Sequence, residues 1–289
     1  MTSNAAAKRL PALQPRRPSD SPGVLARLGR WLVENLPALV VFIGTLATWE
    51  LVVRNIDLRG LPLPAPSVIA TALTENWSAG RWPLGKAAVA TLFEALGGLA
   101  IGTVAGCAVA LATARFATAR DVLLPLAVGA SAVPIIAFAP LMNNWFGVLN
   151  PLSKMMIVAV LVFFPVVVNV TRGLTQVEPA ALELMRSYAA SEWTVLRVLR
   201  LPNALPYFFT ALKLGTTLSL IGAIVGEYFG GSSGVLGRVV VQSSSALRFD
   251  VTWAAIILAA ITGIVLYLAV AAIERAVIPW HASVRSQEP

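Results

Sequence analysis

The chain has 289 residues, of which 57% are hydrophobic and only 12% are charged, with a mean hydropathy of +0.76. A soluble domain carries about 25% charged residues, so this composition argues against a soluble protein and predicts an integral membrane protein. The formal net charge of +8 belongs to Lys and Arg residues between apolar runs, which indicates membrane orientation and not nucleic-acid binding. One Cys (Cys107) and one His (His281) exclude a disulfide within the chain and argue against a metal cluster, so we expect no metal.

The N-terminal segment differs in composition from the rest of the chain. Residues 1–34 are rich in Lys, Arg and Pro, which predicts a disordered basic tail. No clear small-residue cleavage site follows the first apolar run, so that run is predicted to be a signal-anchor that stays in the protein.

Six apolar segments are long enough to cross the hydrocarbon core, which takes about 20 residues in a helix. The segments Val122–Met142 and Val251–Ile273 contain no charged residue at all. The sequence therefore predicts an all-α integral membrane protein with six transmembrane helices. The predicted spans are 36–53, 87–114, 122–142, 152–171, 204–228 and 251–274.

The distribution of basic residues predicts the orientation of these spans. Lys and Arg are concentrated in the tail, in the 115–121 turn, in the 172–203 stretch and at the C-terminal end, which favours both termini in the cytoplasm. The predicted organisation is a cytoplasmic tail 1–34, a transmembrane domain 35–280 with a core of about 82–276, and a cytoplasmic tail 281–289.

Proline and glycine mark local features within this framework. "LPLPAPSVIATALTENW" predicts a Pro-rich turn and an amphipathic stretch on the outer surface. Gly98, Gly102 and Gly106 recur every four residues, as do Gly222, Gly226 and Gly230, which favours close helix packing within the chain over a dimer face. Pro125, Pro134 and Pro140 are predicted to break the third span, a feature found beside cavities and transport paths.

Recognisable catalytic motifs are absent from the sequence. "GEYFGGSSGVLG" lacks the Gly-Lys-Ser/Thr ending of a phosphate loop, and no nucleophile elbow or His-Glu-x-x-His pair occurs, so an enzyme is disfavoured. Ionisable residues inside a membrane indicate function by default, although those near span ends can snorkel. Trp145 is equally well explained as an interfacial anchor. The candidate translocation-path residues are Asn143, Asn144, Trp145, Glu227, Lys213 and Glu94.

The stretch 172–206 is unusually polar for this chain. Glu178-Pro179 predicts a helix start, and Ala181, Leu184, Met185 and Tyr188 then form one apolar stripe. Ser191 can cap a second short helix, in which Val195, Val198, Leu199 and Pro202 repeat the spacing before the next span. Such a helix pair either lies on the lipid headgroups or docks in the groove of a partner protein.

This stretch resembles the cytoplasmic "EAA" loop of type I ABC importer permeases, whose pattern is Glu-Ala-Ala, a later Gly, and a closing Ile-x-Leu-Pro. Glu183 takes the Glu position, Leu199 the Ile position, and Leu201-Pro202 the closing pair. Leu184-Met185 replace the two alanines, and Ala189 stands where Gly is usual. An alanine can still form the tight turn between the two helices if its backbone stays out of the left-handed region.

The resemblance extends over nearly the whole chain after residue 35. "LPLPAPSVIATAL", "PIIAFAPLMNNWFG", "ELMRSYAAS" and "GEYFGGSSGVLG" are similar to segments of the nitrate/sulfonate/taurine importer branch, which includes pyrimidine-precursor importers. A self-contained secondary carrier is the alternative, but it would need a coupling-ion site, and a membrane enzyme is disfavoured by the missing polar constellation.

The resemblance implies a permease in a bacterial plasma membrane, usually a homodimer with the path between its copies. Cytoplasmic ATP-binding subunits, an extracytoplasmic substrate-binding protein and membrane lipid are the implied partners, and no cofactor is expected. The solute would be chosen largely by the binding protein. The implied ATPase-coupling residues are Ala181, Glu183, Leu184, Met185, Tyr188, Ala189, Leu199, Leu201 and Pro202.

Overall fold

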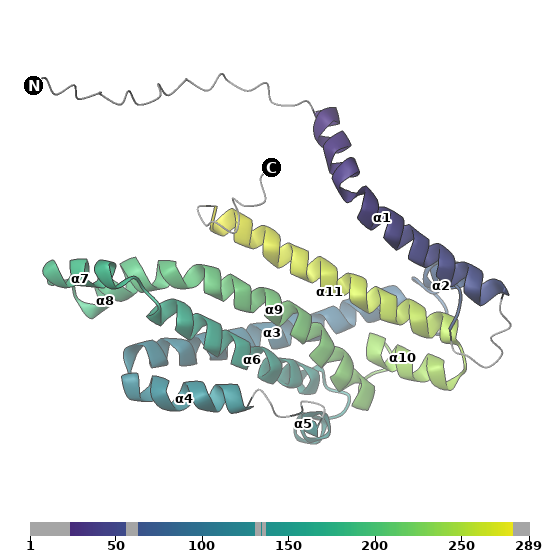
Figure 1. The fold of residues 1–289 in the computed structure, drawn as a ribbon. Coiled ribbons are helices and arrows are strands. Elements are labelled where there is room, and N and C mark those ends of the chain that lie inside the picture. The colour runs from purple at the N-terminus through teal and green to yellow at the C-terminus, as the bar shows by residue number, and fades with distance from the viewer. Residues whose placement is uncertain (1–23, 56–62, 131–133, 135–136, 280–289) are drawn as a thin grey trace, which may run out of the picture. The chain divides into compact units, whose positions relative to one another are not determined.

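A computed structural model describes residues 24–55, 63–130, 134 and 137–279 (Figure 1). The chain divides into two units, Met1–Ile56 and Asp57–Pro289, which are described separately. The helices are α1 Val24–Asn55, α2 Pro66–Glu75, α3 Leu84–Arg115, α4 Ala117–Ala130, α5 Phe138–Phe146, α6 Pro151–Thr175, α7 Pro179–Ser187, α8 Glu192–Val195, the π-helical segment Leu196–Arg200, α9 Leu201–Phe229, α10 Leu236–Ser245 and α11 Phe249–Val277.

The first unit contributes one described helix, α1. Its stretch Asn35–Asn55 is long and apolar enough to span a membrane, as predicted, and none of it is buried in the protein. Large apolar side chains such as Val41 and Phe42 are exposed, which suits a helix surrounded by lipid. Residues 24–34, assigned from the sequence to the tail, continue this helix, whereas residues 1–23 and 280–289 lie outside the described part of the chain.

In the second unit, the helices α3, α6, α9 and α11 match four of the predicted spans, and each is long and apolar enough to cross a membrane. The predicted span 122–142 is different, because it is divided between α4 and the short helix α5. The two helices are separated around Pro134, whose ring cannot continue a regular helix, whereas Pro125 lies inside α4 and Pro140 in the first turn of α5. The expectation that all three prolines break the span is therefore wrong for Pro125.

The core of this unit is formed by α3, α6 and α9, which meet through glycines. A Cβ placed on Gly98 would lie 2.5 Å from the carbonyl oxygen of Met155 in α6, and one on Gly102 would lie 2.5 Å from that of Ala159. Gly222 of α9 faces α6 in the same way, with Leu161 2.7 Å from an added Cβ. Both glycine series thus pack helices within the chain, which confirms the sequence interpretation.

Helix α2 is an amphipathic element beside α11, as the Pro-rich segment predicted. It begins with Pro66 in its first turn and buries Ile69 and Ala72, while Val68 is exposed. Helix α10 also contacts α11, and α2 and α10 lie at the end of the unit opposite to α7 and α8 (Figure 1).

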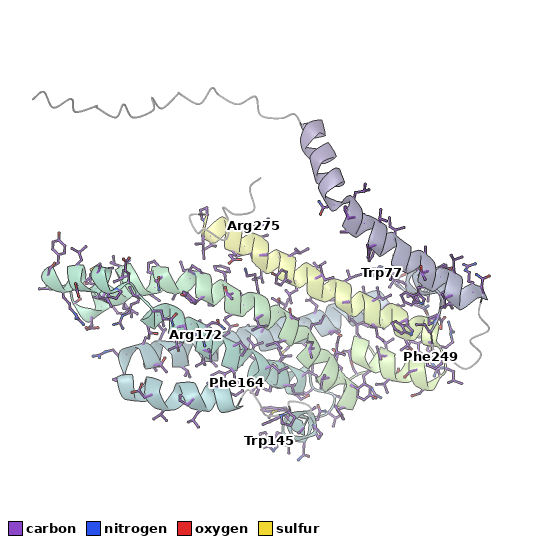
Figure 2. The ribbon with its side chains drawn as sticks, viewed as in Figure 1. Trp77, Trp145, Phe164, Arg172, Phe249 and Arg275 are labelled. Carbon is purple, nitrogen blue, oxygen red and sulfur yellow. The ribbon has the colours of Figure 1, made fainter. Side chains whose placement is uncertain are left out.

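Two of the spans end in arginines at the same end of the second unit. Arg172 and Arg275 lie in the last turns of α6 and α11, toward the end that carries α7 and α8, whereas Trp77 and Phe249 lie at the other end (Figure 2). Cations near helix C-termini interact favourably with the helix dipole, and basic residues gather on the cytoplasmic side of membrane proteins. The arrangement therefore keeps these two arginines on one side of the spans.

Candidate functional site

The polar stretch predicted from the sequence forms a helical loop at one end of the second unit. Helix α7 begins at Pro179, with Glu178 at its N-cap, and α8 begins after Ser191. The Ser191 hydroxyl accepts a hydrogen bond from the Thr194 amide at 3.2 Å, so the predicted capping role of Ser191 is confirmed.

The turn between α7 and α8 depends on Ala189. Its φ is +48°, in the left-handed region, so the turn forms without the condition that we had set for an alanine, a backbone outside that region. The Ala190 amide donates to Met185 O at 3.0 Å and the Ala189 amide to Arg186 O at 2.9 Å, which is a Schellman termination of α7. A Schellman turn requires a left-handed residue after the helix, which explains why an Ala adopts a conformation that favours Gly.

Large apolar side chains of this loop are exposed. Leu184 is 57% exposed and Tyr188 is 77% exposed, while Ala181 and Met185 of the same predicted stripe are half-buried and Glu183 is exposed. No residue of α7 is buried. Exposed apolar surface on a helix marks a site of interaction with another protein or with lipid.

Sequence reasoning missed one exposed aromatic residue here. Trp193 in α8 is 68% exposed, and Val198 on the following segment is also exposed. We name Leu184, Tyr188, Trp193 and Val198 the apolar patch of the loop. The signal for Trp193 was available, since a Trp in a short polar helix outside a span is a candidate interface anchor.

The sequence suggested that the second short helix is separate from the next span, but the two are joined in the structure. A continuous helix runs from Glu192 to Phe229, with a π-helical segment at Leu196–Arg200. The Leu201 amide donates to Leu196 O, so the helix passes Pro202, which has no amide proton, with one wider turn before it. Of the predicted coupling residues here, Leu199 is half-buried, whereas Leu201 and Pro202 are exposed.

At the opposite end, three ionisable side chains from three helices form a buried cluster. Glu94 of α3, Lys154 of α6 and Glu227 of α9 are almost completely buried, with Lys154 and Glu227 at 0% exposure. The Lys154 ammonium donates to Val148 O, whereas Glu94 Oε2 and Glu227 Oε1 have no hydrogen-bond partner among the described residues. The positive charge of Lys154 lies near both carboxyl groups and offsets part of the cost of burying them.

The cluster also holds the start of α10. The Gly237 amide donates to Glu227 Oε2 at 2.6 Å, and the Leu236 amide donates to the Thr91 hydroxyl at 2.9 Å. These two amides belong to the first turn of α10, where intrahelical partners are missing. Side chains of α3 and α9 therefore cap α10 together, and Lys154 and Thr91 are members that sequence reasoning did not single out.

The remaining candidate path residues fall into different environments. Asn143 is buried beside Gly230, and neither its side-chain nitrogen nor its side-chain oxygen has a hydrogen-bond partner among the described residues. Asn144 and Trp145 are exposed at the end of α5 (Figure 2). Lys213 forms an ion pair with Glu274 of α11 at 2.7 Å, so it is engaged in contact between α9 and α11.

Metal-ligating side chains do not gather in the described residues: no group of three or more His, Cys, Asp or Glu is placed to hold an ion. The absence of a metal or cofactor remains a prediction. The geometry offers protein docking at the loop and polar contacts at the opposite end.

The chain resembles known transport proteins. A family model described as "Binding-protein-dependent transport system inner membrane component" matches residues 98–280. The taurine transport system permease protein of Escherichia coli is 30% identical over 263 residues, covering 89% of this chain and 94% of the relative. The riboflavin transport system permease protein of Chloroflexus aurantiacus is 27% identical over 256 residues, covering 88% of this chain and 92% of the relative. The formylaminopyrimidine transport permease protein of Halalkalibacterium halodurans is 29% identical over 250 residues, covering 86% of this chain and 97% of the relative.

Proposed function

Because the chain belongs to the family of binding-protein-dependent transport system inner membrane components, it is an ABC importer permease, and we propose that two copies form the path for a small solute. Separate ATP-binding subunits hydrolyse ATP on the cytoplasmic side, and an extracytoplasmic binding protein delivers the solute. Both termini are cytoplasmic in this arrangement, in a bacterial inner membrane.

The observation that carries the coupling part of this proposal is the exposed apolar patch. Leu184 and Tyr188 extend from α7, which buries none of its residues, and Trp193 extends from α8. Amphipathic helices bind partners by laying such a face into an apolar groove. We infer that α7 and α8 occupy a groove of the ATP-binding subunit, with Glu183 fixing the register through a charged contact at the rim.

Substitution of Glu183 tests this docking. Glu183→Arg should leave membrane insertion intact and lower ATP-driven uptake by at least about tenfold, because reversing a charge at a docked interface costs more than about 1.4 kcal/mol. The matched control is Glu75→Arg, since Glu75 is also exposed but ends α2 at the other end of the unit. Normal uptake by Glu183→Arg, with the ATP-binding subunit still attached, would rule out the docking role.

We infer that the solute path passes the buried polar residues near α5. Asn143 supports this assignment, because a buried amide without a described partner is stabilised when water or a polar solute reaches it. Glu94 and Glu227 lie in the buried cluster, Glu227 caps α10, and Lys213 is paired with Glu274, so we infer that their role in the path is indirect. Asn143→Leu should raise the solute concentration for half-maximal uptake while the complex still assembles, and Asn144→Leu should not.

The solute class follows from the relatives only as a proposal. A solute of the nitrate/sulfonate/taurine class is favoured, and the alternative is a pyrimidine or vitamin precursor, because relatives are named for taurine, nitrate, formylaminopyrimidine and riboflavin transport. The test is calorimetric titration of the cognate binding protein with taurine, ethanesulfonate, nitrate and riboflavin in turn. Uptake of the bound compound into vesicles that contain the whole complex then identifies the solute.

A further inference from the structure

The helix that follows the loop is hydrogen-bonded to the ends of two other spans. Arg200, the last residue of the π-helical segment, donates from Nη1 to the carbonyl oxygen of Ala114 at 3.1 Å. Ala114 is in the last turn of α3, where carbonyl groups lack an intrahelical partner. A guanidinium at this position therefore satisfies an otherwise free carbonyl and interacts favourably with the negative end of the α3 dipole.

Asn203 makes the corresponding contact with α6. Its Nδ2 atom donates to Gly173 O at 2.7 Å and to Gln176 O at 3.1 Å, at the C-terminal end of that helix. The two backbones approach closely here, because a Cβ added to Gly173 would lie 2.7 Å from the Cα atom of Ala204. One amide group thus holds the start of α9 against the end of α6.

The ends of α3 and α6 are also joined directly. The hydroxyl groups of Thr113 and Thr171 are hydrogen-bonded at 2.9 Å, and both side chains are buried. Arg200 and Asn203 are three residues apart and therefore lie on neighbouring positions of one helical surface. The loop is connected through these two side chains to a pair of helix ends that are themselves held together.

We propose that Arg200 and Asn203 are positioning residues that make the cytoplasmic ends of α3 and α6 follow the loop when the ATP-binding subunit moves it. We name their three hydrogen bonds to Ala114, Gly173 and Gln176 the carbonyl clamp. The proposal rests on the docking of α7 and α8 described above, and it adds the route by which displacement of the loop reaches spans other than α9. The alternative is that the clamp only stabilises the folded chain.

Three variants separate these roles. Arg200→Ala removes the donor to α3, and Asn203→Asp replaces the donor to α6 with an acceptor that repels both carbonyl oxygens. Arg197→Ala is the matched control, because Arg197 is an exposed arginine of the same π-helical segment whose side chain has no hydrogen bond or ion pair to a described residue. Loss of one such hydrogen bond changes an equilibrium by about tenfold, so each clamp variant should reduce ATP-driven movement of its span while Arg197→Ala does not.

The measurement is a distance between spin labels in the whole complex. Labels are placed on Glu192→Cys in α8 and Arg115→Cys at the end of α3, both exposed positions, after Cys107→Ser removes the single native thiol. Dilution with unlabelled chain isolates the distance within one copy. On trapping with Mg-ATP and vanadate, this distance should stay constant in the otherwise unsubstituted chain and should change by about 1–2 Å with Arg200→Ala, the size of helix shifts in switching proteins.

Rescue and assembly complete the test. Arg200→Lys retains a donor to Ala114 O and should restore the constant distance, as loss of the positive donor in Arg200→Ala would require. The ATP-binding subunit should copurify with every variant in the same ratio. An unchanged distance with Arg200→Ala in an assembled complex would overturn the clamp alone, whereas failure of any ATP-binding protein to copurify with the unsubstituted chain would overturn the proposed function as well.

Discussion

Ala189→Gly should stabilise the turn between α7 and α8. Ala189 has a φ of +48° and closes a Schellman turn, yet it is an exposed residue whose methyl group fills no core. A left-handed conformation costs a residue with a Cβ about 1–2 kcal/mol, which Gly avoids. Gly gains about 0.4–1 kcal/mol of freedom in the unfolded chain, which offsets part of this. The net stabilisation of the turn is therefore about 0.5–1 kcal/mol.

Hydrogen exchange measures this local effect, because an exposed loop opens without unfolding of the whole chain. The amides of Ala189 and Ala190, which donate to Arg186 O and Met185 O, should exchange about two- to fivefold more slowly in Ala189→Gly, as 0.5–1 kcal/mol requires. Ala190→Gly is the matched control at a position without positive φ, and it should exchange faster. Faster exchange in both variants would refute the strain argument.

Leu247 offers an independent test of the same physics. Its φ is +57°, and the Arg248 and Leu247 amides donate to Ser243 O and Ser244 O, so α10 ends in the same kind of turn. Leu247 is exposed, and Leu247→Gly should also slow exchange of these two amides. A gain at only one of the two turns would mean that contacts outside the turn decide the result.

Three further substitutions probe the spans, with the melting temperature of the purified protein in detergent as the measurement. Gly98→Ala should lower the melting temperature strongly, because the new methyl group would lie 2.3 Å from Val158 Cβ. Gly44→Ala is the control and should leave the melting temperature unchanged, because no described atom lies within 4 Å of the added methyl group. Lys213→Met should lower the free energy of unfolding by about 1–3 kcal/mol, because it leaves the Glu274 carboxylate unpaired. Adding Glu274→Leu should recover most of this loss of stability. A double variant that melts no higher than Lys213→Met would contradict the ion-pair argument. Glu227→Leu should lower the free energy of unfolding by about 1–3 kcal/mol, because it leaves an α10 amide without its acceptor. Glu227→Gln should lower it less, since the amide oxygen of Gln can still accept. Equal losses of stability in the two variants would contradict the capping role.

Much of the fold could be predicted from the sequence because lipid imposes a length rule on apolar helices. Five predicted spans are helices long enough to cross a membrane, and the glycine series at Gly98 and Gly222 pack within the chain. The prediction of the third span as one helix was wrong, because hydropathy does not show where a helix is interrupted. The break lies around Pro134, and only tertiary context decides that Pro125 is tolerated within a helix.

The candidate site was predictable where its signals are local. Pro179 and Ser191 start their helices as their residue types predict, and Leu184 and Tyr188 are exposed. Contacts between residues far apart in the chain carry no such signal. Arg200 bonds to Ala114, 86 residues away, which no periodicity in the sequence reveals. The conformation of Ala189 was not predicted, because a left-handed alanine is rare and the residue type alone does not indicate the turn that requires it.

The unbroken helix from Glu192 to Phe229 makes the loop and the buried cluster two points on one rod. Its 38 residues correspond to a length of about 57 Å at 1.5 Å per residue. If the rod stays stiff and pivots at its α8 end, each degree of tilt displaces its far end by about 1 Å, so a small rotation is magnified along its length. The far end carries Glu227, whose carboxylate holds α10. A tilt of this helix about α8 would thus displace Glu227 on the opposite side of the membrane directly, without a series of intermediate conformational changes.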